Sequence, residues 1–442
     1  MNTKWSGSNL HQHDGHWLGR HLLSRWATAC LALGLLAFPS FGAEKGNSPK
    51  GGTRMDPVKR AESIRRVCER LGIGAGKVIA DVGCGKGTDT MTFAEVVGPG
   101  GKVYAEEIEQ KLLDEMLQKT RERKLEQVVA VLGATEDPHL PDGSLDMIFM
   151  HQVFHHFAKP LNMLNRLWVN LKPGGCLVIV DRQRGPQREW VDMAGREKKH
   201  SWTGETTVVR LARESGFRFE AAPEELWADK QPFVFVFRKP KGIKKPAGDP
   251  DLPAPIKGKT AVSELPVMPM SQPQILFVGI DHGRSLLPEL QKLKSQPHIY
   301  DAMIEEWTTW KDELPADAKS GTAEIVRTAN DDLPGLANRI LNAAVVADAY
   351  SRLWDPAPLL KRVHQSLSAG GYVAILDRKG PDNEPRRLAG HNRRIATGLV
   401  KSDMEQAGFE MVKELKTPAK DRFFLLFRPR GSEREATIRK TR

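Results

Sequence analysis

The segment from residue 78 to residue 88, VIADVGCGKGT, restricts the possible folds more than any other part of the chain. An apolar, partly β-branched run that contains Asp81 is typical of a buried parallel strand, and residues 90–97 begin a helical pattern. Three glycines stand between them: Gly83, Gly85 and Gly87. Glycines at such a turn let the backbone approach a ligand, towards which the helix points its N-terminal amides. The segment therefore predicts a nucleotide-binding strand, turn and helix, with a turn that binds nothing as the alternative.

The spacing of the glycines separates two classes of nucleotide site. The dinucleotide fingerprint G-x-G-x-x-G needs a glycine at position 88, where this chain has Thr88, so NAD is disfavoured. The pattern D-x-G-x-G-x-G resembles the first motif of the class I S-adenosylmethionine (SAM)-dependent methyltransferases, where it lines the methionine end of the cofactor. The resemblance implies SAM as the cofactor, with Asp81 and the three glycines at its site.

A second acidic position follows at the end of the next apolar run, residues 102–108. In nucleotide-binding α/β folds an acid there binds both ribose hydroxyls, since a carboxylate can accept two hydrogen bonds. The resemblance assigns this role to Glu107. Glu106 is the alternative if the register differs by one residue. The remaining alternative is that both glutamates are solvent-exposed surface residues that bind no ligand.

Recognition of the adenine is less direct. Methyltransferases often place an acid after the glycine that ends strand three, and this chain has Ala134 in that place. The resemblance then moves the role to Glu136, to Asp137 or to a backbone amide.

The next motifs extend the resemblance over residues 56–240. Strand four leads into the aromatic and histidine pair Phe154-His155, a helix spans residues 161–171, and K-P-G-G precedes a fifth strand at residues 176–180. The K-P-G-G turn resembles a late feature of the methyltransferase fold in general. The D-P-x-L-P loop at residues 137–141, the pair Phe154-His155 and a distal His200 resemble, more narrowly, a bacterial branch with a methyltransferase type 11/25-like domain. That branch tends to carry an acid where this chain has His156.

Methyl transfer from a sulfonium is an in-line displacement, so a protein mainly orients the acceptor and sometimes takes a proton. His155 lies just past strand four, where open α/β sheets bind ligands, and its ordinary pKa suits that role. We interpret His155 as the base, with His200 and His156 as weaker candidates and simple packing as the alternative. His151 and its neighbours offer no third ligand at a zinc spacing, so no metal is expected.

The second half of the chain repeats the first. Residues 102–182 align without a gap on residues 298–378, so that Asp181-Arg182 meets Asp377-Arg378. We interpret this as an internal duplication. The second copy has two glycines in its first turn, Met303 in place of Glu107 and Ser351 in place of His155. We expect it to bind no SAM and to serve packing, substrate capture or dimerisation.

The fold class follows as α/β: two Rossmann-like methyltransferase domains, each a mostly parallel twisted sheet flanked by helices. The expected boundaries are a signal peptide (1–43), a flexible segment (44–55), the methyltransferase domain (56–240), a Pro/Lys-rich linker (241–273), the degenerate domain (274–430) and a basic tail (431–442). The N-terminal segment, the linker region and the tail carry the net charge of +11. The domains themselves are then nearly neutral, and no specific nucleic-acid partner is expected.

Basic residues followed by a short apolar stretch and small residues near Ala43 predict a cleaved export signal, with an uncleaved anchor as the alternative. Cleavage would leave three cysteines, no disulfide framework and no stable membrane span, in a periplasmic or secreted protein. The partners implied are a small-molecule methyl acceptor and a second domain or copy of the chain. The first hypothesis is a SAM-dependent methyltransferase, and the alternative is an exported pseudo-methyltransferase or ligand-binding protein.

Overall fold

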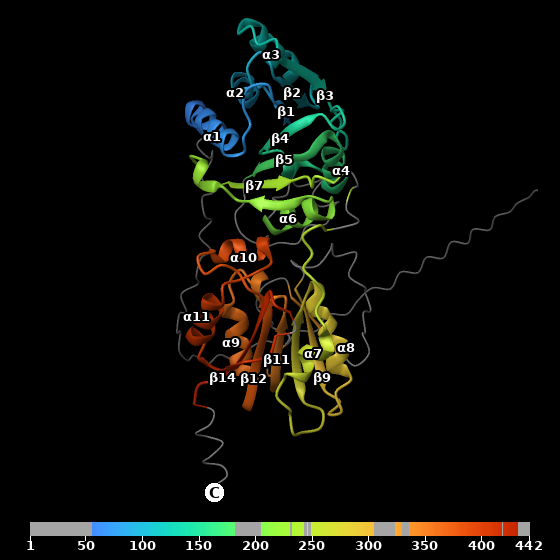
Figure 1. The fold of residues 1–442 in the computed structure, drawn as a ribbon, viewed down its shortest axis with the longest axis vertical. Coiled ribbons are helices and arrows are strands. Elements are labelled where there is room, and N and C mark those ends of the chain that lie inside the picture. The colour runs from blue at the N-terminus through green and yellow to red at the C-terminus, as the bar shows by residue number, and fades with distance from the viewer. Residues whose placement is uncertain are drawn as a thin grey trace, which may run out of the picture. The chain divides into compact units, whose positions relative to one another are not determined.

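The computed structural model of the chain describes residues 55–181, 205–229, 232–242, 245, 249–304, 323–328, 336, 338–417 and 419–431. Residues 55–442 form one compact unit that contains two seven-stranded sheets (Figure 1). Each sheet is mostly parallel and carries helices on both faces, which confirms the expected α/β class.

The first sheet has the strand order β3-β2-β1-β4-β5-β7-β6. Its strands are β1 (Val78–Val82), β2 (Lys102–Glu107), β3 (Val128–Leu132), β4 (Leu145–His151), β5 (Leu171–Asp181), β6 (Arg218–Ala221) and β7 (Phe233–Arg238). Its helices are α1 (Pro57–Arg70), α2 (Thr88–Val97), α3 (Gln110–Glu122), the 3₁₀ turn η1 (Phe154–His156), α4 (Pro160–Asn170), α6 (Glu205–Glu214) and the 3₁₀ turn η2 (Glu224–Leu226). β7 runs antiparallel to β5, and β6 runs antiparallel to β7.

Apolar residues on the two faces of the first sheet explain the helix positions. One core joins the sheet to α1, α2 and α3 through residues such as Val67, Phe93 and Met116. The other core joins it to α4 and α6. Asp56 fixes the start of α1, because its side chain accepts hydrogen bonds from the backbone N–H groups of Val58 (2.8 Å) and Lys59 (3.3 Å).

The K-P-G-G segment differs from its expected place between a helix and a strand. β5 begins at Leu171, which pairs with Leu145, and regular pairing resumes where Cys176 meets Met147. The segment therefore forms an irregularity inside β5, and Gly174 takes the left-handed conformation with φ of 81°.

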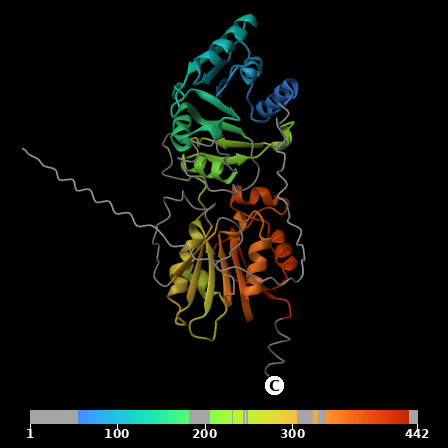
Figure 2. The same ribbon diagram turned by 180° about the vertical axis from the view of Figure 1, so that it is seen from behind.

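The second sheet repeats this order as β10-β9-β8-β11-β12-β14-β13. Its strands are β8 (Gln274–Gly279), β9 (His298–Ile304), β10 (Ala323–Thr328), β11 (Leu341–Ala347), β12 (Leu367–Arg378), β13 (Phe409–Glu414) and β14 (Arg422–Pro429). Its helices are α7 (Gly258–Ser263), the 3₁₀ turn η3 (Asp281–Leu286), α8 (Leu287–Gln291), the 3₁₀ turn η7 (Tyr350–Arg352), α9 (Ala357–Ser366), α10 (Arg386–Asn392) and α11 (Thr397–Gln406). Helices α7 and α8 cover one face and α9, α10 and α11 the other, as both views show (Figures 1 and 2).

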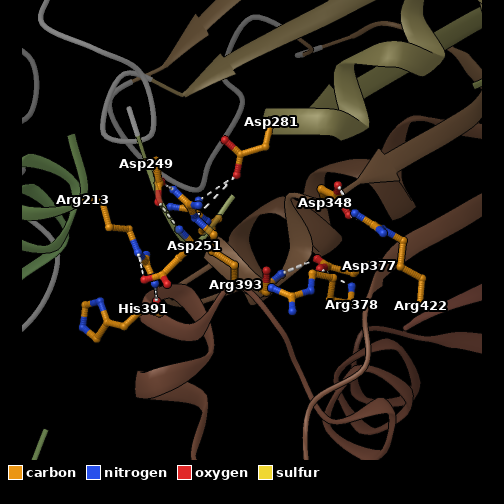
Figure 3. Close-up of polar contacts among 12 residues, drawn as sticks. Arg213, Asp249, Asp251, Asp281, Asp348, Asp377, Arg378, His391, Arg393 and Arg422 are labelled. Carbon is orange, nitrogen blue, oxygen red and sulfur yellow. Dashed lines mark hydrogen bonds and ion pairs between the residues drawn. The ribbon is translucent and has the colours of Figure 1, made fainter. Parts of the chain in front are cut away.

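Part of the segment read as a linker is packed against the second sheet. Ile256 and the α7 residues Ala261 and Val262 are buried in the core that joins α7 and α8 to the sheet. Further upstream, Asp249 is paired with Arg393, and Asp251 is 3.1 Å from Arg213 of α6 (Figure 3). The described linker residues are thus held by contacts to both halves of the compact unit.

Ion pairs fill the carboxyl edge of the second sheet. Arg422 of β14 holds Asp348, just after β11, through two hydrogen bonds of 3.0 and 3.1 Å (Figure 3). Arg352 holds Asp281 at 3.0 Å, directly after β8. At the same edge, a Cβ atom on Gly283 would lie 2.0 Å from the carbonyl oxygen of Ala347. Backbone and side chains of the chain itself therefore occupy this edge.

Candidate functional site

A cavity of about 710 Å³ lies at the carboxyl ends of the strands of the first sheet. The strand order reverses between β1 and β4, and open α/β sheets bind ligands outside such a point. The described wall includes Gly83 after β1, Glu106 and Glu107 at the end of β2, Ala134 and Thr135 after β3, and His151, His155, His156 and Phe157 at and after the end of β4. The volume falls in the range of roughly 300–1,000 Å³ that ligand pockets usually have.

The glycine turn after β1 has the backbone that its sequence predicts. Gly83, Gly85 and Gly87 all have positive φ, at 68°, 54° and 76°. A Cβ atom would lie 2.5 Å from Val153 at Gly83 and 2.3 Å from Met116 at Gly87, so both positions also exclude side chains by contact. At Gly85 a Cβ atom would enter open space. Gly83 belongs to the described cavity wall.

Asp81, near the end of β1, is hydrogen-bonded to the helix that follows the same turn. Its side chain is buried and accepts a hydrogen bond of 2.6 Å from Thr90 Oγ1 in the first turn of α2. Burial and the neighbouring Asp89 raise the pKa of Asp81 to about 7. Asp81 thus holds the start of α2 against β1.

Both acids at the end of β2 reach the glycine turn. Glu107 Oε2 accepts from the backbone N–H of Gly85 (3.0 Å), and its Oε1 accepts from that of Ile108 (2.8 Å). Glu106 Oε2 accepts from Gly83 N–H (3.1 Å), but Glu106 is only 2% exposed and its buried Oε1 has no hydrogen-bond partner among the described residues. Glu107 is the more accessible of the two alternatives.

Burial raises the pKa of Glu106 to about 8. A carboxyl whose folded-state pKa is raised stabilises the fold fully below its unfolded pKa, and this contribution is lost as the pH rises through the folded value. Glu106→Gln is therefore expected to stabilise the protein relative to wild type by an amount that grows from about pH 4.5 to pH 8, on the order of a few kcal/mol. Urea denaturation at pH 5 and pH 8 measures this difference. The exposed Glu126→Gln serves as the control, and an equal effect of Glu106→Gln at both pH values would contradict the assignment.

Glu136 and Asp137 lie near the adenine position in sequence but are engaged elsewhere. Glu136 accepts from Lys159 (2.5 Å) and Asn162 (2.8 Å), and Asp137 pairs with Arg166 at 3.1 Å. In this loop the described cavity wall contains Ala134 and Thr135. Glu136 and Asp137 are not among the described residues of the wall.

His155 forms a couple with an acid that the sequence motifs did not indicate. His155 Nδ1 is 2.8 Å from Asp181 Oδ1, and the backbone N–H of His155 donates to Asp181 Oδ2 at 3.1 Å. Asp181 closes β5, the neighbour of β4 in the sheet, and this adjacency brings the two residues together. The absence of an acid directly after His155 therefore does not exclude a histidine and acid couple.

A second histidine and acid couple lines the same cavity. His151, the last residue of β4, has its Nδ1 3.1 Å from Asp89 Oδ2. Asp89 also accepts two hydrogen bonds of 2.5 Å from Arg60 of α1. No sequence motif pointed to Asp89 or Arg60.

The remaining predictions concern metal, cysteines and the distal histidine. The described residues contain no cluster of three or more metal-binding side chains. Cys68 and Cys176 are buried and Cys84 is half-buried, all three as free thiols. His200 and the export segment lie outside the described residues. No helix in the described part of the chain has the length and apolarity of a membrane span.

Comparison with known proteins shows a similarity to methyltransferase domains. Residues 73–216 match a family model described as "Methyltransferase domain". The chain is 27% identical over 215 residues to an uncharacterized 37.1 kDa protein in transposon TN4556 of Streptomyces fradiae, covering 45% of this chain and 59% of that protein. It is 29% identical over 113 residues to a demethylmenaquinone methyltransferase of Geobacillus sp., covering 26% of this chain and 48% of that enzyme. The chain thus spans only about half the length of these relatives.

A solved structure, described as a SAM-dependent methyltransferase from Aquifex aeolicus, is 26% identical and has a TM-score of 0.35. The match covers 42% of this chain and all of that one. The residues that match the family model, 73–216, contain the described cavity wall and both histidine couples.

Proposed function

We propose that residues 56–240 form a SAM-dependent methyltransferase that transfers a methyl group to a small-molecule acceptor. The cavity carries this proposal: it lies where the strand order reverses, between the glycine turn after β1 and the acid at the end of β2. The match of residues 73–216 to a methyltransferase domain supports it.

The residues present fit SAM. Glu107 offers a carboxylate for the ribose hydroxyls, the turn from Gly83 to Gly87 offers backbone and open space for the methionine part, and Ala134 and Thr135 border the adenine side. When bound, SAM supplies an electrophilic methyl group on a positively charged sulfur. The acidic end of β2 also gives a favourable potential for that charge.

His155 accepts the acceptor's proton in this proposal. Asp181 holds Nδ1, so the neutral imidazole carries its proton there and presents Nε2 as the basic atom. His155 belongs to the cavity wall and is stacked against the ring of His156, with 4.1 Å between the ring centres. Asp181 therefore acts as a positioning residue, and the site provides orientation and a proton acceptor.

The second sheet is proposed to be a degenerate copy produced by duplication. Both sheets have the same strand order, and the backbone contact from His155 to Asp181 recurs as a hydrogen bond of 2.8 Å from Ser351 N–H to Asp377. The ion pair of Arg422 with Asp348 (Figure 3) lies at the edge where the first sheet has its cavity. The ion pair of Arg352 and the close contact at Gly283 lie at the same edge.

Titration of the full chain with SAM by calorimetry tests the proposed function. Glu107→Ala is expected to weaken SAM binding by about tenfold to a hundredfold, because a hydrogen bond to a carboxylate contributes roughly 1.5–3 kcal/mol. Glu126→Ala, exposed and distant from the cavity wall, is the control. An unchanged affinity in Glu107→Ala would remove Glu107 from the site, and no binding by wild type would overturn the function.

The stoichiometry of that titration tests the second copy. We expect one SAM per chain, because the corresponding edge of the second sheet is filled by its own side chains. Two equivalent sites per chain would contradict the assignment of a degenerate domain.

We also propose that residues 1–43 direct export and are then removed. Terminal sequencing of the protein recovered from the periplasm or medium of its bacterial host would find a new N-terminus near residue 44. Recovery of the intact N-terminus in the membrane fraction would instead indicate the uncleaved anchor.

A further inference from the structure

His151 is built into the cavity wall in a fixed orientation. Its side chain is only 6% exposed, and its ring lies edge-on against Trp227 with 5.1 Å between the ring centres. The bond from Nδ1 to Asp89 is the one hydrogen bond that the described residues make with this ring. Because Nδ1 is engaged by Asp89, Nε2 is the ring nitrogen that remains available to a molecule in the cavity.

Asp89 determines which nitrogen of His151 carries the proton. Burial alone would raise the pKa of Asp89, but the hydrogen bonds from His151 and from Arg60 outweigh burial and hold this pKa below its ordinary value. Asp89 is therefore an ionised carboxylate, which can only accept hydrogen bonds. His151 must donate from Nδ1, so the neutral ring keeps its basic lone pair on Nε2.

The charge of the wall restricts what can bind beside His151. The described wall residues include the three acids Glu106, Glu107 and Glu109 but no lysine or arginine. Val153, Phe157 and Met163 add apolar surface. Apart from its three histidines, the described part of this wall offers a carboxylate or phosphate group no basic side chain, whereas a neutral molecule with an apolar body would lose little on desolvation.

We propose that His151, held by Asp89 and Arg60, is a second proton-accepting residue of this cavity, which selects a neutral acceptor with an ionisable hydroxyl or thiol group. The proposal rests on the methyltransferase function and specifies its acceptor class. The acceptor oxygen or sulfur forms a bond to the methyl carbon, while the bond from that carbon to the sulfonium sulfur breaks and leaves its electron pair on sulfur. For an acceptor whose hydroxyl or thiol lies on the His151 side of the cavity, His151 Nε2 takes the proton in place of His155, and Asp89 stabilises the resulting imidazolium.

Nitrogen NMR of the histidine rings in the full chain, saturated with S-adenosylhomocysteine, tests this proposal, with phenol as the probe. Before phenol is added, the His151 resonances should show the neutral ring protonated at Nδ1. Asp89→Asn should increase the neutral form that is protonated at Nε2. Phenol should shift the His151 Nε2 resonance, and His151→Gln should weaken phenol binding about three- to tenfold. His139→Gln is the matched control, because His139 is exposed and outside the described wall, with its Nδ1 on the carbonyl of Leu132.

Benzoate, which carries a carboxylate on the ring in place of the hydroxyl of phenol, tests the acceptor class. It should bind at least tenfold more weakly than phenol, and equal affinity would overturn the selection of neutral acceptors. Phenol binding that shifts His155 and leaves His151 unchanged would overturn the role of His151. Failure of S-adenosylhomocysteine to bind wild type would overturn the proposed function itself, a result seen before any phenol is added.

Discussion

Replacing His155 by alanine is expected to lower the turnover number by roughly a hundredfold or more and to leave SAM affinity nearly unchanged. The imidazole of His155, which is hydrogen-bonded to Asp181, lines the cavity, and the proposed function assigns the cofactor to Glu107 and the glycine turn. Removing the base therefore affects the chemical step and not the cofactor site. The measurement is transfer of labelled methyl from SAM, after a screen of thiols, phenols, amines and small carboxylates has identified an acceptor.

Asp181→Asn and His139→Gln complete this experiment. Asp181→Asn should also reduce turnover, because the His155 ring then loses the carboxylate that sets its protonated nitrogen. His139→Gln should retain wild-type turnover, since His139 is exposed and outside the described wall. Wild-type turnover in His155→Ala would make His155 a packing residue and would leave the proton to His151 or to solvent.

Local patterns were sufficient to predict β1, β2 and the glycine turn. The apolar run at residues 78–82 is β1, and the run at residues 102–107 is β2 with Glu107 as its last residue. Such patterns work because a parallel strand that is covered on both faces needs an apolar run, and a turn with positive φ needs glycine. Both signals lie within a few neighbouring residues.

The histidine couples depend on distances that local patterns do not contain. His155 and Asp181 are 26 residues apart, and His151 and Asp89 are 62 residues apart. Asp181 could have been found, because two parallel strands that pair bring their carboxyl ends to the same edge. Asp89 lies in the first turn of α2, where an acid is ordinary at a helix N-terminus, so its sequence context gave no signal.

The loop after β3 shows a different limit of prediction. Glu136 and Asp137 stand close to the expected adenine position, but Lys159, Asn162 and Arg166 bind their carboxylates. These partners come from α4 and the turn before it, so their arrangement depends on tertiary packing. In the linker, Asp249 is hydrogen-bonded to Arg393 and Asp251 to Arg213, and each arginine lies more than thirty residues away in the sequence.

Replacing Gly85 by valine is expected to abolish measurable SAM binding while the protein remains folded. A Cβ atom at Gly85 meets no heavy atom within 4 Å, so the added side chain enters open space at the glycine turn, where the proposed function places the methionine part of SAM. The positive φ of 54° adds backbone strain of roughly 1–2 kcal/mol for a residue with a side chain, so stability must be controlled separately from binding.

Gly98→Val provides that control within the same chain. Gly98 follows the last residue of α2, has φ of 62°, and a Cβ atom there also meets nothing within 4 Å. Gly98 has ψ of −175°, a combination with positive φ that is essentially restricted to glycine, so Gly98→Val also carries backbone strain, but it stands at the opposite end of α2 from the glycine turn. Thermal unfolding should show destabilisation of both variants, and calorimetry should show SAM binding retained in Gly98→Val only. Equal SAM affinity in the two variants would mean that the open space at Gly85 is not where the cofactor binds.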